Sequence, residues 1–169
     1  MDITELILED HHQQRRMFAL LEDIVPSDTH ALGVVWHRLC TTLEVHAVAE
    51  EELFYPHLLK VGTGVGEESV DDEVVDVIKD HNEIRDAIRE SAGHQPGTDA
   101  WWAAVQKTNK ANSEHMAEEE REDLTDFRRN APLQLRHDIA VAFATFEADH
   151  VRGVVVTDRD PKRYVTEHR

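Results

Sequence analysis

The chain has 169 residues, of which 40% are hydrophobic and 31% are charged, a composition that suits one globular domain of amphipathic helices. Its formal net charge of −17 disfavours nucleic-acid phosphates and anionic lipid headgroups as partners, and favours cations. The single cysteine excludes an internal disulfide, no run approaches the roughly 20 apolar residues of a membrane span, and no leader pattern is present, so a cytoplasmic location is expected.

Apolar residues recur at steps of three and four along most of the chain, which predicts helices. Pro26, the glycines of VGTGVG and the segment GHQPGTD separate these runs. The candidate N-caps are Ser69 or Asp71 for the third helix and Thr98 or Asp99 for the fourth. The predicted helices cover residues 3–24, 30–55, 69–91 and 98–123, and the second ends near residues 56–60. Four helices of this length with modest connections predict an all-α fold, an antiparallel four-helix bundle.

A fifth helix is predicted over residues 131–150, where apolar side chains line one side. We expect it to pack on the bundle, so that residues 1–150 form one domain. The remaining residues 151–169 read as a polar tail. Its end is expected to fray, with Tyr164 and Val165 as the residues suited to docking.

Two histidines stand four residues before a glutamate: His46 with Glu50, and His115 with Glu119. Either spacing alone arises by chance in a chain with 12 histidines. The second pair follows the first by 69 residues, however, so the pairs occupy matching places on the second and fourth predicted helices. Their matching places on two helices, rather than the His-x-x-x-Glu spacing itself, make the two pairs candidates for function.

The first and third predicted helices also correspond. DHHQQRRMF, from Asp10, and DHNEIRDAI, from Asp80, share an Asp-His pair and an arginine four residues after the histidine. These segments lie 70 residues apart. The chain therefore contains a weak internal duplication, and each half carries Asp-His on one helix and His-x-x-x-Glu on the next.

Side chains four residues apart project from one helix face, so each His-x-x-x-Glu pair can reach one ion or two adjacent ions. Apolar neighbours place His11 and His81 inward as well, and all six side chains can meet at mid-height in the bundle. A purely structural role is the alternative, but each buried polar group without a partner costs roughly 1–3 kcal/mol. Four imidazoles and two carboxylates suit a pair of iron ions, with manganese as a second possibility.

The order H, HxxxE, H, HxxxE on a four-helix bundle resembles the hemerythrin-like (HHE cation-binding) family. DHHQQRRMFALL, LEVHAVAEEELFYPHL, DHNEIRDAI and SEHMAEEERED carry the resemblance, which covers about residues 3–123. It implies a non-haem, oxo- or hydroxo-bridged di-iron centre with His11, His46, Glu50, His81, His115 and Glu119 as ligands. The internal alignment selects His11 over His12, because His11 matches His81 whereas His12 matches Asn82.

The sequence departs from the oxygen-carrying hemerythrins, whose third helix has two histidines four residues apart and whose fourth has histidine and aspartate five apart. Here Arg85 follows His81 by four residues and Glu120 follows His115 by five. The departures put simple O2 carriage in doubt. They favour a centre that reacts with or responds to peroxide, O2 or nitric oxide in oxidative stress. A peroxide- or nitric-oxide-consuming enzyme, a sensor without turnover and an O2 carrier remain alternatives.

Other residues near these motifs are assigned to packing or to solvent. Tyr55 is expected to pack rather than approach the metals, and Glu51 and Glu52 are expected to face solvent. Asn112, nearly one turn before His115, is a candidate for orienting a ligand.

The remaining histidines are expected to lie outside the site. Structural or solvated roles are predicted for His30, His37, His94, His137 and His168, and His57 lies too far along its helix to reach the same ion. A ferritin-like di-iron site is a minor alternative, and it would use Glu9, His12, Glu147 and His150. Its weakness is that two of these residues fall on the fifth helix.

Overall fold

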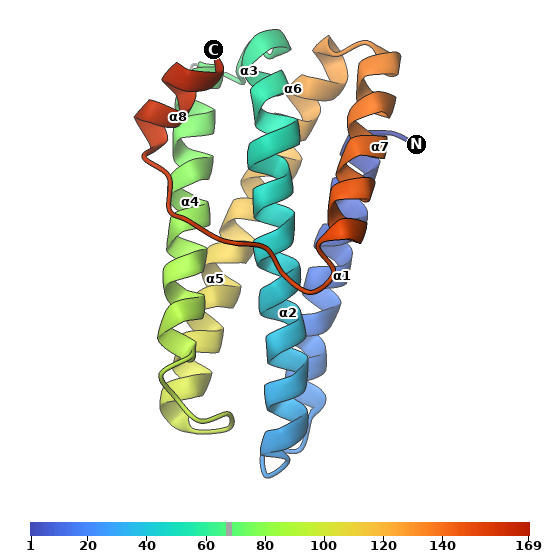
Figure 1. Ribbon diagram of the computed structural model, residues 1–169. Helices are drawn as coiled ribbons and strands as arrows, with labels where there is room; N and C mark the ends of the chain where they lie inside the picture. The colour runs from blue at the N-terminus through green and yellow to red at the C-terminus, as the bar shows by residue number, and fades with distance from the viewer. Residues whose placement is uncertain (67–68) are drawn as a thin grey trace.

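The computed structural model describes residues 1–66 and 69–169. Figure 1 shows four long helices side by side, with successive helices antiparallel. They are α1 (Ile3–Asp23), α2 (Thr29–Ala49), α4 (Val70–Ser91) and α5 (Asp99–Arg121). Contacts of α1 with α2, α2 with α4, α4 with α5 and α5 with α1 close the bundle. The predicted all-α four-helix bundle is confirmed.

Side chains at the helix starts explain most of the boundaries. Asp2, Asp28, Ser69 and Thr98 each accept a hydrogen bond from a backbone N–H of the first turn that follows. Of the predicted candidates, Ser69 rather than Asp71 and Thr98 rather than Asp99 are the caps observed. The predicted loop before Ser69 includes residues 67–68, which lie outside the described residues.

Two bundle helices are followed directly by further helical segments. After α2 the chain runs through a π-helical turn, η1 (Glu50–Phe54), into α3 (Tyr55–Val61). Pro56 lacks a backbone N–H, so the regular ladder cannot continue here, and the N–H of Tyr55 instead bonds to the carbonyl of Glu50. After α5 the chain bends at Glu122 and continues as α6 (Asp123–Asn130).

The apolar core is divided into two clusters. One lies toward α3 and α6 and contains Ile7, Ile78 and Leu124, and the other, toward the far ends of the helices, contains Phe18, Ile84 and Trp101. His11 falls between Ile7 and Phe18 along α1, and His81 falls between Ile78 and Ile84 along α4. A layer of polar side chains therefore separates the two clusters inside the bundle.

The C-terminal part of the chain covers one side of this bundle. Helix α7 (Leu133–Asp149) packs on α1 and α2, and α8 (Pro161–His168) packs on α4. Between them residues 150–160, here called the strap, cross α2 in an extended path (Figure 1). The expectation that the tail frays is wrong: Asp160 caps α8, and Tyr164 and Val165 are buried.

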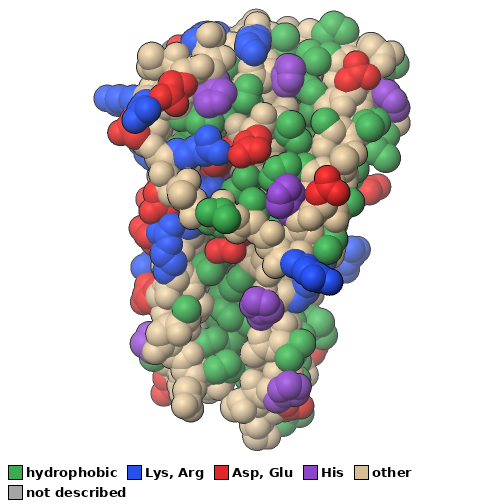
Figure 2. Space-filling view, viewed as in Figure 1, with side chains coloured by type: hydrophobic (Ala, Val, Ile, Leu, Met, Phe, Trp, Pro, Cys, Tyr) green, Lys and Arg blue, Asp and Glu red, His purple; other side chains and the backbone are tan. Residues whose placement is uncertain are grey.

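Figure 2 shows basic and acidic side chains intermingled over α4 and the C-terminal segment, with histidines scattered across the same surface. Four of the five histidines predicted to be structural or solvated are exposed, namely His30, His37, His94 and His137, and His168 is half-buried. In the part of the chain that the structure describes, every helix is too short or too polar to cross a bilayer.

Candidate metal centre

Each of the four bundle helices delivers one histidine to the polar layer. His11, His46, His81 and His115 come from α1, α2, α4 and α5, and none is more than 4% exposed. The rings form two edge-to-face pairs, with centroids 5.3 Å apart for His11 and His46 and 4.7 Å apart for His81 and His115. Each half of the internal duplication therefore supplies one pair of imidazoles.

Glu50 lies between the two histidine pairs. Its Oε1 is 2.8 Å from Nε2 of His46, and its Oε2 is 3.3 Å from Nε2 of His81. Two sets of donor atoms, each within 4.8 Å of one another, share this residue: His11, His46 and Glu50, and Glu50, His81 and His115. Glu50 therefore presents one carboxylate oxygen to each histidine pair.

Glu119, the predicted counterpart of Glu50, has a different environment. Its Oε2 lies 3.1 Å from Nε2 of His11, while its Oε1 accepts a 2.7 Å hydrogen bond from the Tyr55 hydroxyl. Glu119 therefore borders the first histidine pair without entering either donor set. The expectation that Tyr55 merely packs is wrong, because the fully buried ring also directs its hydroxyl at a candidate ligand.

A second layer of carboxylates contacts the outer nitrogens of the same histidines. Nδ1 of His81 is 2.9 Å from Glu51, and Nδ1 of His11 is 2.9 Å from Glu120. Asp10 and Asp80 lie farther from the other two rings, at 3.5 Å from Nδ1 of His46 and 3.8 Å from Nδ1 of His115. A carboxylate on Nδ1 fixes the ring so that Nε2 points at a metal.

Sequence reasoning missed this layer. Glu51 was expected to face solvent, yet it is 0% exposed. The π-helical turn explains the error, since its wider winding lets the adjacent residues Glu50 and Glu51 both point inward. A signal was available in the duplication: each candidate glutamate is followed by another, and each first histidine is preceded by aspartate.

The repeated arginines complete the outer layer. Arg85 donates a 2.6 Å hydrogen bond to Glu51, and Arg15 lies 2.8 Å from Glu120. Thus the position where oxygen carriers have a second histidine holds an arginine that faces an outer carboxylate. Asn112, which was predicted to orient a ligand, donates its amide to Gln14 of α1 instead of to a candidate ligand.

The electrostatics of the inner layer are those of cations paired with carboxylates. Burial lowers the pKa of His81, but contacts with Glu50 and Glu51 outweigh it and raise the value to about 9. Burial likewise opposes the shift of His46, whose pKa is raised well above its usual value by Glu50 and Asp10. For Glu50, burial raises the pKa, and His46 and His81 lower it well below the usual range. The site thus stabilises positive charge beside Glu50.

The residues present fit a pair of metal ions. Among the described residues, several buried polar atoms at the centre make no hydrogen bond of acceptable geometry: Nε2 of His11 and His46, both carboxylate oxygens of Glu50, and Oε2 of Glu119. Unsatisfied buried polar atoms are rare and call for a partner. Imidazole nitrogens and carboxylate oxygens converging in this way are a donor set that iron accepts.

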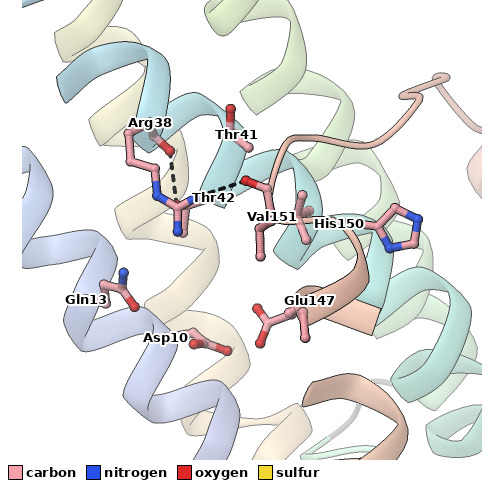
Figure 3. A pocket seen from close by; sticks show the side chains of 10 residues that line it. Asp10, Gln13, Arg38, Thr41, Thr42, Glu147, His150 and Val151 are labelled. Atoms are coloured by element: carbon pink, nitrogen blue, oxygen red, sulfur yellow. Dashed lines mark hydrogen bonds between the residues drawn. The ribbon is translucent and has the colours of Figure 1, made fainter. Parts of the chain in front are cut away.

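A surface pocket of about 220 Å³ opens beside the first histidine pair, between α1, α2 and α7. Figure 3 shows Asp10 of α1 and Glu147 of α7 facing each other across it, with His150 at its edge. Asp10 and Glu147 also form a third set of candidate donor atoms, with His46. At this α7 pocket, Glu147, which lies outside the four-helix bundle, brings its titratable carboxylate close to His46.

The described residues do not form the ferritin-like site that the sequence offered as an alternative. Glu9 and His12 are exposed, and neither they nor His150 belong to any set of donor atoms close enough to share an ion. Glu147 belongs to such a set only through the α7 pocket. His57, at the α3 end, is half-buried and likewise outside these sets.

A family model for the hemerythrin HHE cation-binding domain matches residues 2–126. The chain belongs to this hemerythrin family. Comparison with curated proteins and with solved structures gives no match. The hemerythrin match ends within α6, so α7, the strap and α8 lie beyond the matched residues.

Proposed function

We propose that this hemerythrin-family protein is a non-haem di-iron protein that reacts with or responds to small oxidants, namely peroxide, O2 or nitric oxide. The observation that carries the proposal is Glu50, whose two carboxylate oxygens face separate histidine pairs. A single-ion site would not require a carboxylate shared between two sets of imidazoles.

In this proposal His11 and His46 would hold one ion and His81 and His115 the other. Glu50 would offer a carboxylate oxygen to each, and Glu119 would be a further carboxylate beside His11. Bound iron would supply the redox and Lewis-acid chemistry for a small oxidant. The protein itself fixes the imidazole rings through their outer carboxylates and keeps bulk water away from the buried layer. Tyr55, with its hydroxyl on Glu119, is the hydrogen-bonding group available next to the ions.

Simple O2 carriage is the less favoured function. The two positions that supply extra ligands in oxygen carriers hold Arg85 and Glu120. Arg85 contacts the outer carboxylate Glu51, and Glu120 contacts the outer nitrogen of His11, so among the described residues neither belongs to a set of converging donor atoms at the centre. Fewer nitrogen ligands leave coordination positions for reaction with an oxidant. A sensor without turnover is the second candidate, because the strap and α8 contact Glu51 directly beside the site. The cytoplasmic location stays a prediction from the sequence.

Metal analysis of protein produced with added iron tests the binding. We expect about two irons per chain, as in other bundles with carboxylate-bridged centres, and near-ultraviolet bands of a bridged pair. His46→Ala should lose at least half of the iron, whereas His37→Ala, an exposed histidine of the same helix, should keep it all. Equal iron in both variants, or manganese in place of iron, would contradict the proposal.

Reaction with oxidants separates the candidate functions. The iron-loaded protein is mixed with peroxide, O2 or nitric oxide, and the consumption of oxidant per iron is measured together with the absorption spectrum. Many equivalents consumed by the native protein and none by His46→Ala indicate an enzyme. A single equivalent with a lasting spectral change indicates a sensor, and full reversal on removing O2 indicates a carrier.

A further inference from the structure

The C-terminal segment beyond the family match returns to the buried polar layer. After α7 the strap crosses α2 and reaches α4, where α8 begins (Figure 1). At this point Asn82 of α4 holds the backbone of Arg159 on both sides: its amide donates to the Arg159 carbonyl at 2.9 Å, and its oxygen accepts from the Arg159 N–H at 3.2 Å. These two hydrogen bonds fix the strap to α4 at Asn82, the residue that follows His81.

This attachment aims the Arg159 side chain at Glu51. Nε of Arg159 lies 2.7 Å from Oε2 of Glu51, and its guanidinium lies 5.7 Å from the centre of the Tyr164 ring. The Tyr164 hydroxyl in turn donates to the backbone carbonyl of Glu51. Glu51 is fully buried while Arg159 is 30% exposed, so the strap supplies a cation that reaches inward from the surface.

The other oxygen of Glu51 serves the metal centre. Its Oε1 is 2.9 Å from Nδ1 of His81 and accepts a 2.6 Å hydrogen bond from Arg85. One carboxylate thus joins a candidate ligand on one side to the C-terminal strap on the other. Glu51 is thus contacted by a hydrogen bond from Arg85 at Oε1 and by an ion pair with Arg159 at Oε2, and the two contacts restrict its rotation away from the ring that it orients.

We propose that Arg159 is a positioning residue for this centre: it holds Glu51 in the orientation that fixes His81 toward the metal. The strap thereby becomes part of the site, although it lies outside the family match. The consequence for iron rests on the proposed function, whereas the positioning itself is testable in the metal-free protein.

The His11 side of the polar layer supports this assignment by contrast. Glu120 makes the equivalent contact with His11 and has the equivalent arginine, Arg15, but its side chain is 28% exposed. The position that matches Asn82 holds His12, which is exposed. The strap therefore attaches where the sequence of the two halves differs, and only the His81 half gains a second arginine among the described residues.

The first test measures the Nδ1 proton of His81 by NMR in metal-free protein, assigned by its loss in His81→Gln. Bonded to buried Glu51, this proton should give a low-field signal that exchanges slowly with water. Arg159→Ala should speed its exchange about tenfold or abolish the signal, and Arg159→Lys should restore part of the protection. Arg163→Ala is the matched control, because Arg163 pairs only with exposed Glu167 of the same helix among the described residues.

The second test measures iron affinity in the same variants. Loss of an outer-shell contact typically lowers metal affinity 10- to 100-fold. We expect about a tenfold loss for Arg159→Ala, a smaller loss for Arg159→Lys and none for Arg163→Ala. Should Arg159→Ala fail to fold, Arg159→Gln, which retains much of the side-chain length, replaces it with the same expected losses.

The two proposals fail in different ways. Faster exchange of the His81 proton in a protein that binds no iron would overturn the di-iron function and keep Arg159 as a positioning residue. Native exchange and native iron affinity in folded Arg159→Ala would overturn the role of Arg159 and keep the di-iron function. Equal changes in Arg159→Ala and Arg163→Ala would also overturn it, since they would show a general loosening of the tail.

Discussion

The two halves of the polar layer follow one sequence pattern but differ in exposure to solvent. On the His81 side, the outer carboxylate Glu51 and its arginine are 0% and 2% exposed, and on the His11 side Glu120 and its arginine are 28% and 40% exposed. The difference arises outside the duplicated helices, because the strap and α8 cover Glu51. Two halves that share the His-x-x-x-Glu spacing therefore form one closed and one open side.

Burial of one side changes how much the same contacts contribute to the stability of the fold. An ion pair in water is weakened by solvent and salt, whereas a buried pair interacts strongly and leaves a costly charge behind if one partner is lost. The open side has a modest network that solvent can replace. On the closed side, Glu51, Arg85 and Arg159 depend on one another. The comparison leads to four predictions, from the largest effect to the smallest.

The largest effect is expected from removing the buried outer carboxylate. Glu51→Ala leaves the buried Arg85 without its anion, which should lower the free energy of unfolding by about 3–5 kcal/mol. Glu120→Ala is the matched change on the open side and should lower it by about 1 kcal/mol, because water can reach Arg15. Urea unfolding of the metal-free proteins at pH 7 measures both. Equal losses would show that closure by the tail has no energetic consequence.

Much of this site could be predicted from the sequence because its inner layer follows helical periodicity. The spacing of His46 and Glu50, repeated at His115 and Glu119, placed both pairs on inward faces, and the duplication added His11 and His81. In the folded chain all four histidines and Glu50 lie together, and Glu119 lies beside His11. Regular helices keep residues at these spacings on one face, so the bundle and the convergence of the six residues could be predicted from the sequence.

The unpredicted features depend on local departures from regular helix and on contacts distant in the chain. The π-helical turn moved Glu51 inward and brought Tyr55 to Glu119, and helical periodicity assumes that no such turn occurs. The docking of the tail depends on Asn82 recognising the backbone of Arg159, 77 residues away. A polar segment with two apolar residues gives too weak a signal to predict that contact.

The next effect concerns Tyr55, which has no aromatic counterpart in the other half, where Leu124 stands five residues after Glu119. Tyr55→Phe removes the hydroxyl bonded to Glu119 and should destabilise the metal-free protein by about 2 kcal/mol, as expected for a buried hydrogen bond to a charged group. Tyr164→Phe, which removes a hydroxyl bonded to a backbone carbonyl, should lose about 1 kcal/mol. Thermal unfolding at matched pH measures the two, and a smaller loss for Tyr55→Phe would show that Glu119 does not depend on it.

A smaller effect with a pH dependence is expected in the α7 pocket on the open side. Burial, with the charge of Asp10, raises the pKa of Glu147 from 4.5 to about 7. A raised carboxyl pKa means that the folded state resists ionisation, so stability is lost as pH rises from about 4.5 to about 7. Glu147→Gln removes that loss, and after allowance for solvent screening it should stabilise the protein by about 1 kcal/mol at pH 8.

The measurement compares urea unfolding of native protein and Glu147→Gln at pH 4 and pH 8. The variant's advantage should be present at pH 8 and absent at pH 4, where both side chains are neutral. Glu9→Gln, at an exposed position of α1, is the control and should show no difference between the two pH values. An advantage of Glu147→Gln that is the same at both would point to packing in the pocket instead of charge.

The smallest effect is expected at His12, the open-side counterpart of Asn82. Because His12 is exposed and no described residue of the strap contacts it, His12→Asn should change the free energy of unfolding by no more than about 0.5 kcal/mol and leave the iron content unchanged. Asn82→Ala, in contrast, releases the backbone of Arg159 and should weaken iron binding in the same direction as Arg159→Ala. Iron analysis of both variants is the deciding measurement. Loss of iron in His12→Asn would make His12 a ligand in place of His11. It would then contradict the alignment of His11 with His81 on which the comparison of the two sides rests.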